Sequence, residues 1–302
     1  MPKNDYKIPS RILVKLKNMP THVNLSKIPR ALSPRKFIMG RSTEKTWGLE
    51  KITLSPVYFN SLRLKYALEA LRSVTGKVLE VGSGAGAFVR AIKSYRPDLE
   101  IVGCDIDASL VKLARRLDIR NKYERMDVCN LSYKNASFDA VVIFDVLEHL
   151  EDPKKALFQI KRVLKAKGII HLAIPLEANP FTIHGLFLRL GIKPKEVYAG
   201  HIKQFEIQDI QQLFKNAGFI SIELGYSGHY LYQFIDFSYF LLLNLIRMRV
   251  THTVEGYVEI LPKGLLKSLI SCFRAFLSGL CYLEAVPLRQ FPGLIGHFTA
   301  VK

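Results

Sequence analysis

Short apolar runs alternate with amphipathic stretches through the middle of the chain. Stretches with apolar residues three or four positions apart predict helices around 57–74, after Asp152-Pro153, and from 207 to the stop at Gly218. Five runs have the length and composition of buried strands: 77–82, 100–105, 123–126, 138–144 and 169–174. This alternation predicts a parallel sheet with helices on both faces, which binds its ligands at the carboxyl ends of the strands.

The hydrophobic pattern changes beyond a further predicted strand at 219–224. Residues 230–246 are almost continuously apolar, and residues 265–283 form a second apolar segment with a helical period. In this second segment the apolar side chains share one face, and the opposite face carries Lys267, Ser271, Arg274 and Ser278. A final strand is predicted at 297–302. Both apolar segments therefore lie between the last two predicted strands.

The first predicted strand leads directly into three alternating glycines, Gly82, Gly84 and Gly86. A strand that turns tightly into a helix here lets a ligand approach the backbone and the helix start, so we expect a nucleotide-like ligand. With Asp105 at the distance of a ribose-binding acid, the turn fits the dinucleotide fingerprint in its alanine-ended form. Glu80, just before the glycines, is unfavourable beside a pyrophosphate but favourable beside an ammonium and a sulfonium group.

Together, the motifs of residues 77–174 resemble the core of class I S-adenosylmethionine-dependent methyltransferases. Residues 78–86 resemble the first motif of that family, 102–107 the second, 138–142 with 147–150 the fourth-strand motif, and 163–168 the turn after the following helix. Ala166 and Lys167 replace a proline and a glycine in that turn, which makes no ligand contact. Residues 200–205, followed by 217–219, resemble the small-molecule, ubiquinone-pathway-like branch.

The resemblance implies a Rossmann-like α/β fold: a seven-stranded, mostly parallel sheet with helices on both faces, a last antiparallel strand, and a helical apolar insertion before that strand. It also implies S-adenosyl-L-methionine as the cofactor, with acids at the ends of the second and third strands holding the ribose and the adenine amino group. The implied cofactor-binding residues are Glu80, Gly82, Ser83, Gly84, Gly86, Asp105, Ile106, Asp127, Val128 and Phe144. For Asp107 we expect a helix cap instead.

Methyl transfer from a sulfonium mainly requires alignment of the reactants, exclusion of water and removal of a proton. His149, after the fourth strand, and His201, in the loop before the helix from 207, are the predicted catalytic bases. Asp145, Glu148 and His149 also resemble the metal-binding pattern of ubiquinone-pathway and RNA 2′-O-methyltransferases, with aspartate in place of the first glutamate. Because aspartate shortens the reach, we assign no metal, and an assay in chelator tests the alternative.

Positive charge is concentrated near the start of the chain. The 302 residues have a formal net charge of +18, and residues 1–51 hold 12 lysines and arginines against three acids. We interpret 1–50 as a basic N-terminal extension and 51–302 as the methyltransferase domain, with 226–294 as a hydrophobic insertion. The segment 265–283 has the face separation of an interfacial helix, and basic residues favour anionic lipid. We therefore hypothesise a peripheral contact with an anionic membrane, against a substrate-covering cap or a dimer interface.

The four cysteines show no zinc or CxxC spacing, and no signal-peptide pattern is evident, so we expect a cytoplasmic protein, peripheral on the membrane face. The predicted function is O-methylation of a small or lipid-linked acceptor: a glycolipid, a polyprenyl-linked sugar or a quinone-like headgroup. RNA methylation and a non-catalytic, membrane-associated binding protein are the alternatives, and hydride transfer with a nicotinamide cofactor is a third. Against nucleic acid as a partner, the basic segment lacks the aromatic interleaving of a stacking platform.

Overall fold

The computed structural model describes residues 48, 50–193, 195, 199–246 and 261–302, all within one compact unit, Ser42–Lys302. The predicted basic extension, 1–50, lies outside the described residues except for Gly48 and Glu50.

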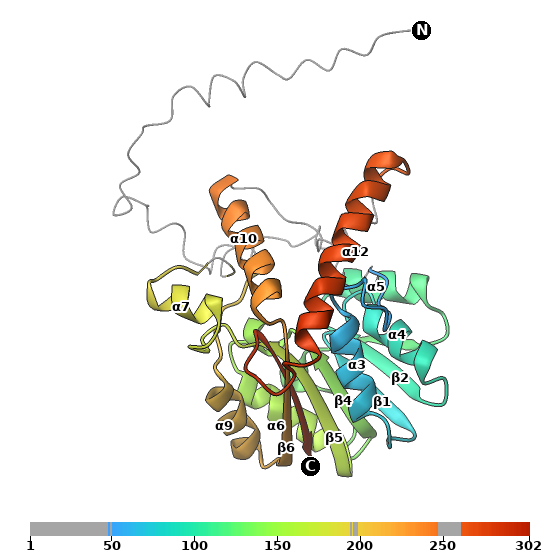
Figure 1. Cartoon of the computed structure of the whole chain (residues 1–302). Helices are drawn as coiled ribbons and strands as arrows, with labels where there is room; N and C mark the ends of the chain where they lie inside the picture. The colour runs from blue at the N-terminus through green and yellow to red at the C-terminus, as the bar shows by residue number, and fades with distance from the viewer. Residues whose placement is uncertain (1–47, 49, 194, 196–198, 247–260) are drawn as a thin grey trace. The chain divides into compact units, whose positions relative to one another are not determined.

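The centre of this unit is a seven-stranded sheet in the order β3-β2-β1-β4-β5-β7-β6 (Figure 1). The five predicted runs form its parallel part, and β7 pairs antiparallel with both β5 and β6. The strand bounds are β1 Lys77–Val81, β2 Glu100–Asp105, β3 Lys122–Arg125, β4 Phe138–Phe144, β5 Leu164–Pro175, β6 Ile220–Ser227 and β7 Ile295–Val301. This topology confirms the predicted Rossmann-like fold class with an antiparallel last strand.

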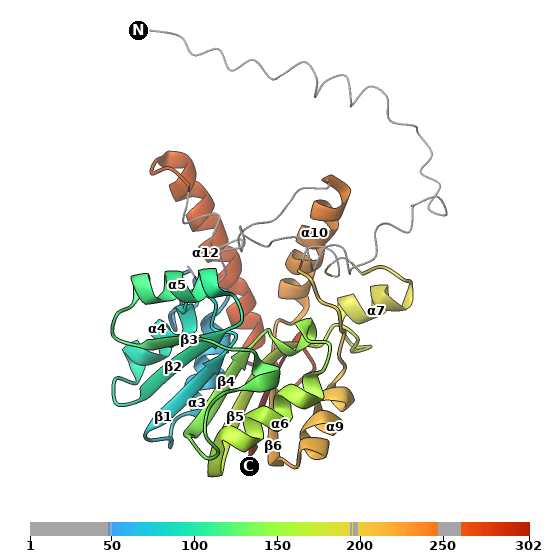
Figure 2. The ribbon, with the colours of Figure 1, turned by 180° about the vertical axis from the view of Figure 1, so that it is seen from behind.

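Helices cover both faces of the sheet because each central strand is apolar on both sides. Helices α3, α4 and α5 pack with Val78, Ile101 and Val142 in one core, and α6 and α9 pack with Leu79 and Val141 in the other (Figure 2). The helix bounds are α3 Ser61–Ala70, α4 Ala87–Tyr95, α5 Ala108–Leu117, α6 Pro153–Val163 and α9 Ile207–Ala217. As expected, the Asp107 side chain caps α5, and Gly218 ends α9 in a left-handed conformation.

One local expectation was wrong. The sequence predicts a turn at 163–168 and a strand at 169–174, but α6 ends at Val163 and β5 already begins at Leu164. Lys167 there adopts φ 62°, and the pairing of β4 with β5 shifts register between Phe138 and Ala140. A short left-handed kink therefore takes the place of the predicted turn.

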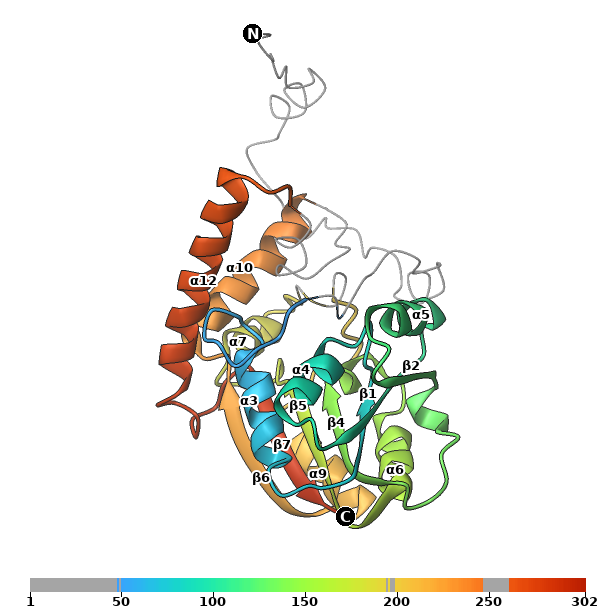
Figure 3. The same ribbon diagram turned by 90° about the vertical axis from the view of Figure 1, so that its right-hand side faces the viewer.

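Two long helices, α10 (Tyr230–Ile246) and α12 (Leu265–Ala285), connect β6 to β7. Since β6 runs parallel to β5, α10 starts at the carboxyl edge of the sheet, and both helices extend beyond that edge in Figures 1 and 3. A short helix that was not predicted, α7 (Ile183–Arg189), packs against α10. The edge of the sheet that binds ligands in this class of fold thus lies at the base of the apolar helices.

Candidate functional site

The glycine turn between β1 and α4 is open to a ligand because it holds its glycines in the left-handed region. Gly82, Gly84 and Gly86 have φ of 71°, 52° and 86°. A Cβ atom at Gly82 would collide with the side chain of Val146, and one at Gly86 would lie 2.6 Å from the Tyr123 hydroxyl. Gly82 and Gly86 therefore require glycine, and the contact of Gly82 with Val146 places the residues after β4 directly against the turn.

The carboxylate of Asp105, at the end of β2, faces the same turn. It accepts hydrogen bonds from the backbone N–H of Gly84 (2.8 Å) and of Asp107 (2.9 Å). Burial raises the pKa of Asp105, and these two bonds oppose that rise. The next residue, Ile106, leaves 64% of its surface exposed, so an acceptor of hydrogen bonds and an apolar surface lie side by side. A ribose and a base suit this pair.

The remaining predicted cofactor residues are divided between the site and the core. Asp127 is exposed after β3, and its side chain accepts the N–H of Cys129 at the start of the short helix η2 (Val128–Asn130). Val128 is buried beneath it. Phe144 ends β4, but its ring stacks on Phe88 of α4 at 3.8 Å between ring centres. Packing thus accounts for the Phe144 ring without a ligand.

Two residues at the glycine turn have buried polar atoms without hydrogen-bond partners in the residues that the structure describes. Glu80 Oε2 and Ser83 Oγ are buried and have no hydrogen-bond partner within the described part of the chain. Burial raises the pKa of Glu80 well above its usual range, and Arg90 opposes this. Glu50, which the motifs did not identify, is also buried, and accepts the N–H of Gly48, whose carbonyl accepts from Arg90. Unsatisfied carboxylate oxygens beside an open backbone turn fit a cationic ligand with an ammonium group.

The structure brings the two predicted bases together. His149 ends the short helix η3 (Leu147–His149) after β4, and the His201 ring lies 5.0 Å from it, centre to centre. The backbone N–H groups of Ile202 and Lys203 both donate to the carbonyl of Glu148, and His149 Nδ1 lies 3.0 Å from the Gly200 carbonyl. These bonds fix the loop before α9 against the end of β4.

His201 has a partner that the sequence did not reveal. Its Nδ1 lies 2.7 Å from Oε1 of Glu177, which follows β5, and both side chains are buried. Burial alone would raise the pKa of Glu177, but His201 and Lys195 lower it to about 2. Glu177 is therefore an ionised hydrogen-bond acceptor, and the hydrogen of a neutral His201 ring resides on Nδ1. The Nε2 lone pair is left to face Glu148, 4.0 Å away.

Behind His201, a row of alternating charges extends to α10. Lys195 Nζ lies 3.5 Å from Glu177 and 2.7 Å from Asp236 of α10, and Asp236 lies 3.0 Å from His184 Nε2 of α7. These side chains are at most 14% exposed. Alternation of sign satisfies charges that would otherwise be costly to bury.

Glu148, His149 and His201 could hold a metal ion, since one ligand atom of each lies within 4.8 Å of the others. Both oxygens of Glu148 are buried without a partner among the described residues, and burial, with Asp145 nearby, raises its pKa well above the usual range. The structure does not add Asp145 to this group as the motif suggests, because Asp145 pairs with Arg63 at 3.2 Å. His201 takes the third position.

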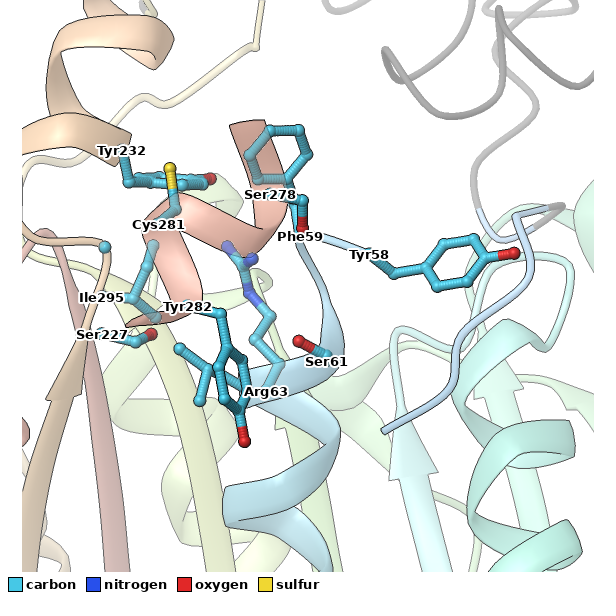
Figure 4. A pocket seen from close by; sticks show the side chains of 12 residues that line it. Tyr58, Phe59, Ser61, Arg63, Ser227, Tyr232, Ser278, Cys281, Tyr282 and Ile295 are labelled. Carbon is cyan, nitrogen blue, oxygen red and sulfur yellow. The ribbon is translucent and has the colours of Figure 1, made fainter. Parts of the chain in front are cut away.

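A small, solvent-open hollow lies between α3, α10 and α12 (Figure 4). Half of the residues that line it carry a hydroxyl group, and Arg63 reaches into the ring of side chains while its far end pairs with Asp145. The hydroxyl-bearing residues are Tyr58, Ser61, Ser227, Tyr232, Ser278 and Tyr282. The hollow thus connects the apolar helices to the end of β4.

These features define a nucleoside-binding α/β protein with an acid–base site. They are a glycine turn with φ above zero, acids at successive strand ends, and a histidine–carboxylate pair at the same edge of the sheet. Comparison with known proteins refines this class. The family described as "Methyltransferase domain" matches residues 79–172.

Two curated relatives and one solved structure illustrate the likeness. Demethylmenaquinone methyltransferase of Thermotoga maritima is 30% identical over 120 residues, which is 38% of this chain and 52% of that protein. Ubiquinone biosynthesis O-methyltransferase of Alkalilimnicola ehrlichii is 30% identical over 146 residues, 45% of this chain and 58% of that protein. Haemonchus contortus phosphoethanolamine N-methyltransferase 2, solved in complex with S-adenosyl-L-methionine, has a TM-score of 0.50 at 20% identity, and the match covers 80% of this chain and 52% of that one.

Residues 79–172 thus match a methyltransferase domain, and the sheet order agrees with the class I S-adenosylmethionine-dependent methyltransferase fold that the motifs resemble. The match spans about half the length of the curated relatives.

Proposed function

We propose that this protein transfers a methyl group from S-adenosylmethionine to an oxygen atom of a small or lipid-linked acceptor. The observation that carries the proposal is the buried His201–Glu177 pair, 2.7 Å apart, at the same edge of the sheet as the glycine turn. A positioned base next to a donor site is what methylation of a hydroxyl group requires.

The donor half is supported by the groups around the turn. When bound, S-adenosylmethionine supplies a methyl group already activated by a sulfonium. Asp105 would accept the ribose hydroxyls, Asp127 the adenine amino group, and Ile106 would cover the adenine face. Glu80, buried with an unpartnered oxygen, would accept the ammonium group. Satisfying that oxygen would offset part of the cost of its burial.

The acceptor half depends on His201. Glu177 fixes the ring through Nδ1–H, so Nε2 is positioned to take the proton of an acceptor hydroxyl. Glu177 then stabilises the charged ring, and Lys195 keeps Glu177 ionised. His149 packs edge-on against His201 and is the second candidate base.

The two curated relatives are a demethylmenaquinone methyltransferase and a ubiquinone biosynthesis O-methyltransferase. They support a quinone-like acceptor; a polyprenyl-linked sugar or a glycolipid is the other acceptor that the apolar helices suit.

The test is methyl transfer from isotope-labelled S-adenosylmethionine to a lipid and metabolite extract, with wild type and the His201→Asn variant compared. We expect a labelled product that is reduced at least a hundredfold in the variant, because a positioned base typically contributes 10²–10⁴ in rate. Calorimetric titration with the donor accompanies the assay. Donor binding without any labelled product would favour a non-catalytic binding protein, label in RNA would favour an RNA methyltransferase, and competition by a nicotinamide cofactor would favour hydride transfer.

A further inference from the structure

The outward face of α12 is apolar over its whole length. At about 100° per residue, its exposed large side chains fall within an arc of roughly 140°. They are Leu265, Leu266, Leu269, Ile270, Phe273, Phe276, Leu280 and Leu283, and this set is here called the apolar face. Among the described residues, α12 is also the one helix long and apolar enough to cross a membrane by length and composition.

The polar face of α12 is turned toward the protein. Ser278 Oγ donates to the carbonyl of Pro56 (2.8 Å), Arg274 donates to the carbonyl of Val57 (2.9 Å), and the Arg274 guanidinium lies 4.9 Å from the centre of the Tyr58 ring. The polar side chains Arg274 and Ser278 of α12 thus bond to the protein and not to solvent. For a helix covered by water, the opposite orientation would bury far more apolar surface.

Helix α10 adds a second set of exposed apolar side chains. It extends past the sheet as α12 does, although the outer ends of the two helices lie apart (Figures 1 and 3). Its exposed apolar side chains are Tyr230, Phe234, Leu241, Leu242 and Leu245. The two helices contain only two acidic residues, and both are bonded internally: Asp236 to Lys195, and Glu284 to the N–H of Leu231.

We infer that α10 and the apolar face of α12 dock this protein on an anionic lipid bilayer. Charge selects lipid over a second copy of the chain: a formal charge of +18 repels another copy but attracts acidic headgroups. Helices of this kind lie in the interface, with the apolar face inserted among the acyl chains.

Docking on the apolar face of α12 brings the base of both helices close to the bilayer, which, on the proposed function, favours a lipid-linked acceptor. Both helices leave the domain at the carboxyl edge of the sheet, and the hydroxyl-lined hollow of Figure 4 lies at their base. A polar headgroup could reach the mouth of that hollow while its chain remains in the membrane.

The experiment is flotation of the full chain with vesicles of equal parts phosphatidylcholine and phosphatidylglycerol, and with vesicles of phosphatidylcholine alone. The test variant is Phe273→Ser/Phe276→Ser, whose side chains are 64% and 61% exposed. The matched control is Phe158→Ser on α6, which is also 61% exposed but lies on another face. We expect wild type and control to float with the anionic vesicles, and the double variant to partition at least tenfold less.

Two outcomes would overturn the inference. A monomer that stays in the aqueous fraction with anionic vesicles excludes docking, and a dimer that the double variant converts to monomer assigns the apolar face to a second copy. Donor titration of the same samples separates this question from the proposed function: donor binding and methyl transfer without flotation would refute docking alone, and flotation without either would refute the activity alone.

Discussion

Replacing Glu177 with glutamine tests the charge arrangement around His201. The substitution keeps the shape and a hydrogen-bond acceptor but removes the negative charge. His201 and Lys195 then remain buried beside a neutral amide, with Lys195 held by Asp236 alone among the contacts described above. We expect a less stable protein and a slower enzyme.

The size of the effect follows from the pKa of Glu177, which lies at about 2 instead of 4.5. That difference corresponds to about 3 kcal/mol in favour of the folded state when the group is ionised. Because the folded pKa is depressed, the stabilisation is complete above pH 4.5 and is lost as the pH falls toward 2. The variant should therefore unfold about 3 kcal/mol more easily at neutral pH, with a gap that narrows below pH 4.5.

Urea unfolding followed by circular dichroism at several pH values measures this gap. The control is Glu223→Gln, at an exposed position of β6. We also expect methyl transfer to fall at least tenfold, because His201 loses the group that orients its ring. A gap that stays constant between neutral pH and pH 4 or below would refute the electrostatic reasoning, and unchanged methyl transfer would refute the positioning role.

Three further changes probe other parts of the site. Glu80→Gln should raise the free energy of unfolding by about 1 kcal/mol, because the raised pKa of Glu80 means that its charge destabilises the folded state increasingly above pH 4.5. The same variant should bind the donor at least tenfold more weakly in calorimetry; a less stable variant with unchanged donor affinity would contradict this. Lys167→Gly should raise the free energy of unfolding by about 1 kcal/mol, seen as a higher urea midpoint, because glycine adopts φ 62° without strain; an unchanged midpoint would show that the kink is unstrained. A chelator should leave methyl transfer unchanged because the proposed base, His201, is oriented by Glu177 and needs no metal ion; loss of activity restored by divalent ions would assign Glu148, His149 and His201 as metal ligands.

The sheet could be predicted from the sequence because its strands are short apolar runs between well-marked turns. Alternation and glycine position suffice for β1, β2 and β4, and the Asp107 cap follows from local chemistry alone. The start of β5 could not be predicted in this way. Leu164 fits the helical period equally well, and only the register against β4 makes it extended.

The partners in the site depend on contacts between distant segments. Glu177, Lys195 and Asp236 lie far apart along the chain and meet only because loops after β5 and before α9 converge on α10. The sequence did indicate that Asp236 has a partner, since it interrupts an apolar segment and a buried acid needs one. The sequence also showed two faces on α12 without indicating which of them the protein would cover.

The pairing of Asp236 with Lys195 bears on how this protein can be made easier to handle in solution. Excising the two apolar helices would seem the obvious way to prevent aggregation, yet it would strip Lys195 of its closest carboxylate and disturb the charges around His201. A shortened protein that dissolves well would then have an altered reaction centre and would not represent the enzyme. Polar substitutions confined to Phe273 and Phe276, whose exposed side chains belong to α12 and make no contact with that ion pair in the structure, would improve solubility and leave the reaction centre intact.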